Sequence, residues 1–311
     1  MGWRRYARRV IATLGDLIDD VVVWAQGPVR RGTDTPARIH RRRGGSAANV
    51  ASMVARCGGA VRFIGAVGDD GVADRLVDQL AADGVDVVVE RVAGRSTGTI
   101  VVLVDPVDGE RSFLTDRGAC DHLATPRTEW LDGVAALHLP LYSFSHEPLS
   151  ATATSVALAA RHRGVQLTID ASSTGAIEDL GVAEALAVIE VLAPDALLAN
   201  AEEARLLGVG TDRPARGPVR SVIRHGAEPT LVVDADGRTT TIPVPPVEDV
   251  VDTTGAGDGF AAGWLLARHR GASAEDAVVE GHAVAARVLR RPGADLAPAV
   301  PPTPAPGVEH S

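Results

Sequence analysis

Two glycines, Gly255 and Gly257, flank Ala256 directly before Asp258, and an apolar run follows at 261–267. Glycine permits a tight turn whose N–H groups converge, and the apolar run has the length and composition of a buried helix. The first N–H groups of a helix lack intrahelical partners and lie at the positive end of the helix dipole. The three amides of this turn therefore predict an anion site that could hold a phosphoryl group without lysine.

Asp258 is the unusual member of this turn. The helix dipole is expected to keep its carboxylate ionised, yet the carboxylate would repel a bound phosphate unless it faced a substrate hydroxyl. This arrangement is that of a phosphoryl-transfer base, which orients an attacking alcohol while amides hold the transferring group. The alternative is an aspartate that caps the helix. The segment is neither a G-x-G-x-x-G nor a Walker loop.

Other polar residues follow predicted strands or glycine pairs. Asp16 follows the apolar run 9–14, at the strand edge where open α/β sheets bind ligands; the alternative is a turn residue. Gly44 and Gly45 lead into an Ala-rich helix that contains Asn49 and reaches about residue 57. The alternative there is an ordinary loop before a helix with Ser46 as its cap.

Asn200 and Glu203 lie three residues apart, on one helical face just after a predicted strand. Taken alone, they are typical of a helix start with acidic residues that suit the dipole. His282 lies in the predicted Ala-rich helix 274–289. It could contact the adenine of a nucleotide, or it could be an ordinary core or surface histidine. Arg117 could reach a substrate hydroxyl or carboxylate, or form a surface salt bridge.

The elements around these residues follow a strand-turn-helix rhythm, which predicts a parallel α/β sheet. Strands are expected near 61–66, 134–139, 165–170 and 196–199, with helices near 149–161 and 184–192. Segments 97–104 and 111–115 instead predict a hairpin joined by a turn at 105–109. Together with short exposed strands at 21–24 and 35–43, this hairpin predicts an appended sheet.

The segment 252–263 closely resembles the second signature of the ribokinase-like (PfkB-type) carbohydrate kinase family. The Gly44-Gly45 pair with Asn49 resembles the first signature of the family. The Gly15-Asp16 pair and the Asn-x-x-Glu motif at 200–203 also resemble family motifs. All of these motifs occur in the family's order, and the resemblance covers residues 10–293. The resemblance implies an α/β fold, a ribokinase-like three-layer α/β/α sandwich with a small β-sheet lid. It implies a nucleotide- and substrate-binding core at 1–16, 46–94 and 121–293 and a lid at 17–45 and 95–120. The Pro-rich tail 294–311 is expected to be disordered.

The implied activity is an ATP-dependent sugar kinase that phosphorylates a primary hydroxyl of ribose, fructose or a similar sugar. Asp258 would be the base, and the amides of Gly255, Ala256 and Gly257 would stabilise the transferring group. The implied contacts are Asp16, Gly44, Gly45, Asn49 and Arg117 to the substrate, Asn200, Arg224, Gly226 and His282 to ATP, and Glu203 and Asn200 to Mg²⁺. Asp252 stands where related enzymes bind a monovalent cation, and that position alone carries the expectation of potassium (K⁺) activation.

Two departures from the family pattern matter. Ser46 stands where ribokinases proper usually carry lysine, so the motif does not single out ribose. Pro229 stands where a second glycine is usual, which predicts a differently shaped nucleotide loop at 224–229. The alternatives are a nucleoside or 2-keto-3-deoxygluconate kinase of the same family, or a catalytically silent sugar- or nucleotide-binding sensor. The sequence does not identify the acceptor or the oligomeric state.

Composition bounds the partners. The 311 residues are 45% hydrophobic and 23% charged, which suits a globular enzyme, and the net charge of -9 argues against non-specific nucleic-acid binding. Cys57 and Cys120 cannot form a disulfide framework. No run of 18 apolar residues occurs, and the apolar stretch after the twin arginine is interrupted at Gly15 and Asp16. We expect a cytoplasmic protein with small-molecule partners, no membrane partner and a homodimer through the lid edges.

Overall fold

The computed structural model describes residues 10–105, 110–211, 213–218 and 220–296. The twin-arginine start, the predicted turn at 106–109 and most of the Pro-rich tail, residues 297–311, lie outside the described residues.

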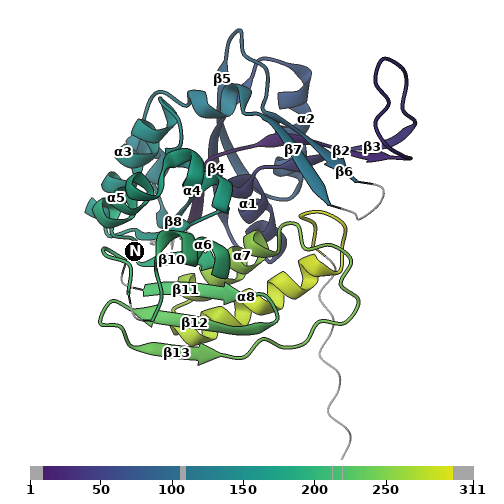
Figure 1. Ribbon diagram of the computed structural model, residues 1–311. Helices are drawn as coiled ribbons and strands as arrows, with labels where there is room; N and C mark the ends of the chain where they lie inside the picture. Colours follow the sequence, from purple (N-terminus) through teal and green to yellow (C-terminus); the bar gives the residue numbers. More distant parts are fainter. Residues whose placement is uncertain (1–9, 106–109, 212, 219, 297–311) are drawn as a thin grey trace, which may run out of the picture.

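In the described part of the chain, nine strands form one sheet in the order β13-β12-β11-β10-β9-β8-β1-β4-β5 (Figure 1). The strands from β11 to β5 are parallel, and β12 and β13 add antiparallel neighbours. Their bounds are β1 (Val10–Leu14), β4 (Val61–Gly68), β5 (Asp86–Val92), β8 (Val134–Pro140), β9 (Gln166–Asp170), β10 (Ala196–Asn200), β11 (Arg220–His225), β12 (Glu228–Asp234) and β13 (Thr239–Ile242). The central strands read as continuous apolar runs because helices cover both of their faces.

The helices form two layers, one on each face of the large sheet, and each layer encloses a hydrophobic core. One layer contains α1 (Ser46–Arg56), α2 (Gly71–Ala82), α7 (Ala256–His269) and α8 (Ala274–Leu289). The other contains α3 (Leu149–His162), α4 (Thr174–Leu180), α5 (Val182–Leu192) and α6 (Ala201–Leu207). Short 3₁₀ helices occur at Gly118–His122, Thr128–Leu131 and Leu141–Phe144. The predicted three-layer α/β/α sandwich is therefore confirmed.

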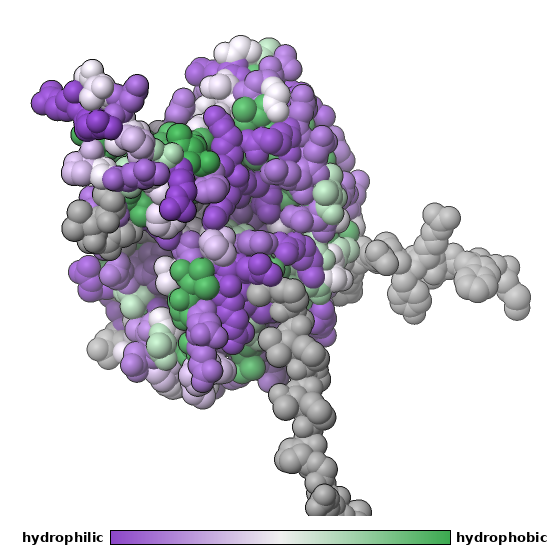
Figure 2. Space-filling model, turned by 90° about the vertical axis from the view of Figure 1, so that its right-hand side faces the viewer, coloured by the Kyte–Doolittle hydropathy of each residue, from purple (hydrophilic) through white to green (hydrophobic). Residues whose placement is uncertain are grey.

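A second, four-stranded sheet projects from the edge of the sandwich (Figure 1). We call it the small sheet; its strands in spatial order are β3 (Ala37–Gly44), β2 (Ile18–Ala25), β6 (Thr99–Val104) and β7 (Arg111–Asp116). The hairpin expected at 97–104 and 111–115 is the antiparallel pair β6–β7, and the appended sheet is confirmed. The face of the molecule that includes the small sheet is mostly hydrophilic, with separate small hydrophobic patches (Figure 2).

Three features bring the candidate residues together. Strands β1, β9 and β10 are parallel, so their carboxyl ends, at Leu14, Asp170 and Asn200, lie at one edge of the sheet. Helices α1 and α7 pack against each other over these ends. Helix α8 crosses α7 closely, where a β-carbon at Gly263 would lie 2.8 Å from the Cα of Gly281.

Candidate active site

Helix α7 begins at the glycine-rich turn that the sequence singled out. Gly255 is its N-cap in the left-handed conformation, with φ of 79°, and a β-carbon there would lie 2.7 Å from the Cα of Ala294. Both the conformation and the close approach require glycine. The amide of Ala256 donates to the carbonyl oxygen of Thr253 at 3.2 Å. Of the three amides predicted to bind an anion, that of Ala256 is thus engaged within the turn.

Asp258 lies in the first turn of α7 and does not cap it. Its Oδ1 accepts a hydrogen bond from Ser46 Oγ at 2.8 Å, and its Oδ2 accepts one from Asn49 Nδ2 at 3.0 Å. Ser46 is the first residue of α1, and Gly45, not Ser46, is the N-cap of that helix. The expectation that Ser46 caps α1 is therefore wrong, because its hydroxyl orients Asp258 instead.

Burial raises the pKa of Asp258 to about 7; the donors Asn49 and Ser46 oppose this rise, whereas the nearby carboxylates of Asp170 and Asp16 add to it. The helix dipole favours the ionised carboxylate, whereas burial raises the pKa toward neutral pH. A carboxyl group that titrates near neutral pH is matched to accepting a proton from a hydroxyl.

Asp16 and its neighbours form the wall beside Asp258. Asp16 is 5% exposed, and its Oδ1 accepts from the amide of Ala47 at 3.3 Å. Gly45, with φ of 93°, packs its backbone against Asp16, since a β-carbon would lie 3.1 Å from the Cα of Leu17. Arg117 lies 3.8 Å from Asp16 Oδ2 and is largely buried, so it does not form a surface salt bridge.

Sequence reasoning missed two members of this wall. The guanidinium of Arg117 lies 4.4 Å from the centre of the Tyr142 ring; because Tyr142 follows strand β8, the rule that identified Asp16 could have found it. The carboxyl group of Asp20 packs 2.5 Å from where a β-carbon of Gly44 would be, so Gly44 makes room for it. Burial, followed by the charges of Asp16 and Asp19, raises the pKa of Asp20 to about 7.

Asn49 is held by a chain of polar side chains. Its Oδ1 accepts from Arg43 Nη1 at 3.3 Å, and Arg43 Nη2 lies 3.4 Å from Asp83 Oδ2. Asp83 Oδ2 also accepts from Ser52 Oγ at 2.5 Å. The chain fixes the amide of Asn49 so that its nitrogen faces Asp258. No sequence signal pointed to Asp83, which is 40 positions from Arg43.

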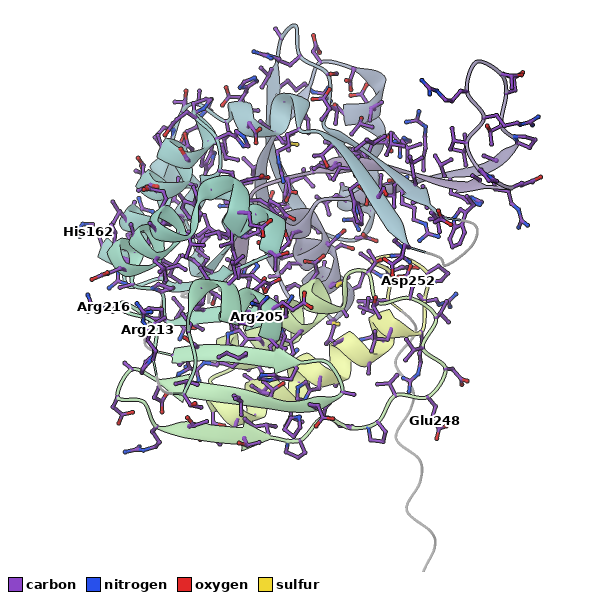
Figure 3. All side chains as sticks on the ribbon, viewed as in Figure 1. His162, Arg205, Arg213, Arg216, Glu248 and Asp252 are labelled. Atoms are coloured by element: carbon purple, nitrogen blue, oxygen red, sulfur yellow. The ribbon has the colours of Figure 1, made fainter. Side chains whose placement is uncertain are left out.

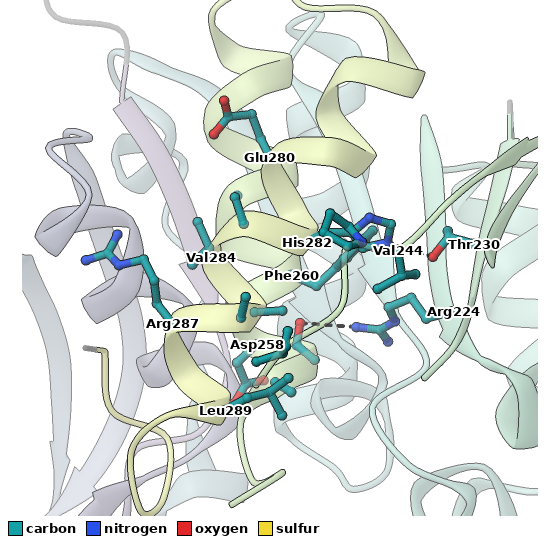
Figure 4. Close-up of a pocket in the computed structure, with 18 of the residues that line it drawn as sticks. Arg224, Thr230, Val244, Asp258, Phe260, Glu280, His282, Val284, Arg287 and Leu289 are labelled. Atoms are coloured by element: carbon teal, nitrogen blue, oxygen red, sulfur yellow. Dashed lines mark hydrogen bonds between the residues drawn. The ribbon is translucent and has the colours of Figure 1, made fainter. Parts of the chain in front are cut away.

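Asp258 also lines a cavity of about 1280 Å³ (Figure 4). The predicted nucleotide residues Asn200, Arg224, Gly226 and His282 line it, together with Glu203, Gly257 and Asp258. The structure describes all of the predicted substrate-binding residues, and none of them lines this cavity: Asp16, Gly44, Gly45, Asn49 and Arg117. The predicted nucleotide residues therefore line the cavity next to Asp258, whereas the predicted substrate residues lie outside it, with Asn49 bonded to Asp258.

Asn200 and Glu203 form a reciprocal capping box at the start of α6. Asn200 Oδ1 accepts from the amide of Glu203 at 2.9 Å, and Glu203 Oε2 accepts from the amide of Asn200 at 2.7 Å. This is the helix-start interpretation left open by the sequence. Burial and then the charge of Asp170 raise the pKa of Glu203 to about 7, against the opposing charge of Arg224.

Arg224 connects the end of the sheet with the turn before α7. Its Nη2 lies 3.2 Å from Asp170 Oδ2, and its Nη1 donates to the carbonyl oxygen of Gly257 at 3.1 Å (dashed in Figure 4). Gly226, with φ of 65°, forms the turn of the β11–β12 hairpin. The hairpin includes Pro229 within β12. Asp170, noted in the sequence only as a strand end, is thus part of the site.

His282 lies beside Phe260 on the cavity wall, with ring centroids 5.5 Å apart. Its Nε2 is 2.8 Å from Thr230 Oγ1, whereas its buried Nδ1 has no hydrogen-bond partner among the described residues. Burial lowers its pKa, so the ring is neutral. In Figure 4, His282, Thr230 and Arg224 lie close together, whereas Arg287 points away from them.

Asp252 does not line this cavity. It lies beside the small sheet (Figure 3), where its Oδ1 is 2.9 Å from Arg111 Nη2 on β7. Among the described residues, no three or more His, Cys, Asp or Glu side chains cluster as a metal site.

Comparison with known proteins gives the class of this protein. The model of the pfkB family of carbohydrate kinases matches residues 9–300. The chain is 33% identical over 278 residues to a fructokinase from Klebsiella pneumoniae, covering 83% of this chain and 85% of that one. It is 31% identical over 238 residues to an aminoimidazole riboside kinase from Salmonella typhimurium, covering 73% and 74%.

Solved structures agree on the fold. An adenosine kinase from Sinorhizobium meliloti superposes with a TM-score of 0.82 at 22% identity, covering 94% of this chain and 97% of that one. A protein assigned as ribokinase II from E. coli, in complex with ATP and Mg²⁺, gives a TM-score of 0.78 at 22% identity, covering 92% and 94%. The chain therefore belongs to the pfkB family of carbohydrate kinases. It is a phosphotransferase that acts on a sugar hydroxyl.

Proposed function

We propose that this kinase transfers the γ-phosphoryl group of ATP to a primary hydroxyl of a sugar, with Asp258 as the base. The observation that carries the proposal is the position of Asp258 between two groups of residues. Ser46 and Asn49 fix both of its carboxylate oxygens from α1, and the cavity opens beside it. A base at this place can face an acceptor on one side and a nucleotide on the other.

In the proposed reaction, the acceptor oxygen attacks the γ-phosphorus while its proton passes to an Asp258 oxygen. The bond from the γ-phosphorus to the bridging oxygen breaks, and ADP leaves. The amides of Gly255 and Gly257 would hold the charge that develops on the transferring group. Ala256 would join them only if its hydrogen bond to Thr253 opened. Asp16, Gly44, Gly45, Asn49 and Arg117 would hold the acceptor.

The residues present fit Mg²⁺ and ATP. Glu203 is 2% exposed and lies near Asp170. Both of these carboxyl groups pair with the guanidinium of Arg224. A divalent cation would relieve the charge that raises the pKa of Glu203. Because both Glu203 oxygens accept bonds within the capping box, Glu203 and Asn200 would act on Mg²⁺ through water. When bound, Mg²⁺ neutralises charge on the phosphates.

The cavity has polar and apolar walls that would suit a nucleotide base. Phe260 and His282, whose rings lie beside each other on the cavity wall, would contact the base. Arg224 and Gly226 lie nearer the phosphate end, since Arg224 contacts Gly257. The E. coli protein reported with ATP and Mg²⁺ supports ATP and Mg²⁺ as the ligands of this fold.

The molecule that receives the phosphoryl group is proposed to be a polyhydroxylated sugar, because the wall beside Asp258 is rich in hydrogen-bond acceptors. The carboxyl groups of the buried Asp16 and the partly buried Asp20 can accept hydrogen bonds from sugar hydroxyls. Ribose, fructose, 2-keto-3-deoxygluconate and nucleosides all carry such hydroxyls. The chain's relatives include a fructokinase and a riboside kinase, so substrate identity needs a direct assay.

The small sheet is proposed to act as a lid and as a dimer surface. Its exposed Ile39, Phe113 and Leu114 are 60%, 62% and 59% exposed, and β3 and β7 are its edge strands. Size-exclusion chromatography with light scattering would test the dimer. No described helix is long and apolar enough to cross a membrane. The cytoplasmic location stays a prediction.

Release of ADP from ATP and Mg²⁺ tests the function. The panel is ribose, fructose, 2-keto-3-deoxygluconate and adenosine, each assayed with wild type, Asp258→Asn and the matched control Asp69→Asn, whose side chain is exposed. Release with one acceptor, retained in Asp69→Asn and lost in Asp258→Asn, supports the proposal. Equal release from wild type and Asp258→Asn contradicts it. Acceptor binding without ADP release across the panel would favour a silent sensor.

A further inference from the structure

The carboxylate of Asp252 has partners on every side. Arg111 Nη2 donates to its Oδ1 at 2.9 Å, and Arg111 Nη1 donates to the hydroxyl of Thr254. The amide of Thr254 also donates to Oδ1, at 2.9 Å, and the amide of Gly293 donates to Oδ2 at 2.8 Å. One carboxylate thus joins the turn before α7, the chain after α8 and, through Arg111, the small sheet.

This contact is mostly sheltered from solvent. The side chain of Asp252 is 11% exposed and that of Arg111 is 30% exposed. Burial opposes ionisation of Asp252, but the amides of Thr254 and Gly293 and the guanidinium of Arg111 outweigh it and hold its pKa below the usual range. Asp252 is therefore a carboxylate with a built-in positive partner three residues before Gly255.

The monovalent cation expected at Asp252 does not fit this arrangement. An alkali ion on the same carboxylate would lie within a few ångströms of the guanidinium, and the two positive charges would repel each other strongly in this partly buried place. Three donors already occupy three of the roughly four acceptor positions of a carboxylate. The positive charge that an alkali ion would bring is already present.

We propose that Arg111 takes the place of a monovalent cation at Asp252, so that turnover does not depend on K⁺. The proposal rests on the proposed kinase function of the same site. Arg111 is a positioning residue: it holds Asp252 and Thr254, and through them the turn at Gly255 that precedes Asp258. Arginine suits this role because it stays charged at any working pH and its planar fork reaches two oxygens at once.

Turnover in three salts tests the proposal. ADP release is measured at equal ionic strength in potassium, sodium and tetramethylammonium chloride, because tetramethylammonium is too large to bind as an alkali ion. Wild type is expected to turn over at the same rate in all three salts. Arg111→Ala is expected to lose at least about tenfold in tetramethylammonium chloride, as for the loss of a charged hydrogen-bond partner, and to recover partly in potassium chloride.

Thermal unfolding in the same salts gives a readout that needs no turnover. The Tm of wild type is expected to be equal in potassium and tetramethylammonium chloride, whereas potassium should raise the Tm of Arg111→Ala. Arg111→Lys keeps a charge at this place and should stay independent of K⁺, which covers the case in which Arg111→Ala does not fold. The matched control is Arg91→Ala, which removes the exposed pair with Asp74 and should behave as wild type.

A specific rise in the Tm or turnover of wild type with K⁺ overturns the proposal, as does an Arg111→Ala variant that matches wild type in all three salts. If wild type releases no ADP in any salt, the kinase function fails, while the unfolding comparison still decides the role of Arg111.

Discussion

Asp258 combines a partly buried carboxyl group with two hydrogen-bond donors, and its desolvation and these donors act on its pKa in opposite directions. Burial raises the pKa to about 7, and the donors Asn49 and Ser46 limit that rise. The balance sets the pH at which the group can accept a proton. A general base must be ionised in the free enzyme, so its activity should increase with pH.

The pH profile of kcat/KM should therefore rise through about pH 7 and reach a plateau above it. Ser46→Ala removes the donor to Oδ1, so the midpoint of the rise should move up by about 0.5 to 1 pH unit. Initial rates of ADP release between pH 5.5 and 9 measure both profiles. A midpoint that stays unchanged or falls in Ser46→Ala would show that this hydroxyl does not stabilise the ionised carboxylate.

Asp258→Asn should separate activity from stability. Turnover should fall by about 10² to 10⁴-fold because the proton acceptor is lost. The amide can still pair with both neighbours, accepting from Asn49 and donating to the hydroxyl of Ser46. The folded carboxyl group holds its proton from about pH 3.8 to about 7, so wild-type stability falls as pH rises through that window. At pH 8 the variant should be more stable by about 1 to 2 kcal/mol.

Urea unfolding of wild type and Asp258→Asn at pH 5 and pH 8 checks the stability part. The gap between the two proteins should widen with pH. The quantity compared is the free energy of unfolding of Asp258→Asn minus that of wild type. A smaller difference at pH 8 than at pH 5 would rule out this linkage.

Residue types and spacing predicted which groups could do chemistry, but not what each side chain contacts. Asp258 and Asn49 were both named, yet their mutual hydrogen bond joins positions 209 apart. Asp20 and Arg43 carried no motif, because their roles depend on packing between segments that are distant in the chain. Tyr142 could have been found from its place after strand β8. Asn200 and Glu203 show the converse, since their spacing predicted the helix start at which they form a capping box. Their proposed magnesium role comes from the family resemblance.

At the scale of elements, local patterns predicted most helices and strands. The helix expected at 274–289 is α8 (Ala274–Leu289), because its ends carry clear signals: Ser273 caps it and accepts from the amide of Asp276. Strands β5 and β13 and helix α4 were not predicted. They have seven, four and seven residues, and segments this short show too little periodicity to be recognised.

The crossing of α7 and α8 should be sensitive to one methyl group. A β-carbon at Gly263 would lie 2.8 Å from the Cα of Gly281 and would also contact the carbonyl oxygen of Glu280. Gly263→Ala should therefore push the helices apart and lower the free energy of unfolding by about 1 to 3 kcal/mol. Since α7 carries Asp258, kcat should fall as well.

Gly71→Ala is the matched control. Gly71 begins α2, and nothing lies within 4 Å of its would-be β-carbon, so the substitution should be neutral or slightly stabilising. Urea unfolding measures both variants. Equal stability of Gly263→Ala and wild type would mean that the helices adjust at no cost.

For the whole molecule, the alternation of strands and helices predicted the three-layer sandwich and the antiparallel hairpin predicted the small sheet. The sequence could not predict how the small sheet meets the core. The contact between Arg111 and Asp252 joins residues 141 positions apart. It depends on the angle between the two sheets, which no local pattern encodes. The expectation of potassium at Asp252 rested on that position alone.

His138 extends the argument to the stability of the whole fold. It lies in the middle of β8, fully buried, and neither ring nitrogen has a hydrogen-bond partner among the described residues. Burial lowers its pKa from the ordinary 6.5 to about 4; the charge of Asp170 opposes this fall and that of Arg224 adds to it. Between these two pH values the unfolded chain binds a proton that the folded protein does not.

Acid should therefore weaken the fold through His138. Stability decreases as the pH is lowered wherever the unfolded state binds more protons than the folded state. By pH 5 the loss from this group should reach about 2 kcal/mol. His138→Leu removes the titrating ring and an unpaired buried polar group, so the variant should lose correspondingly less stability between pH 7 and pH 5. The exposed His40→Leu is the control and should follow wild type. Parallel losses in all three proteins, measured by urea unfolding, would show that acid weakens the fold through other groups and not through this histidine.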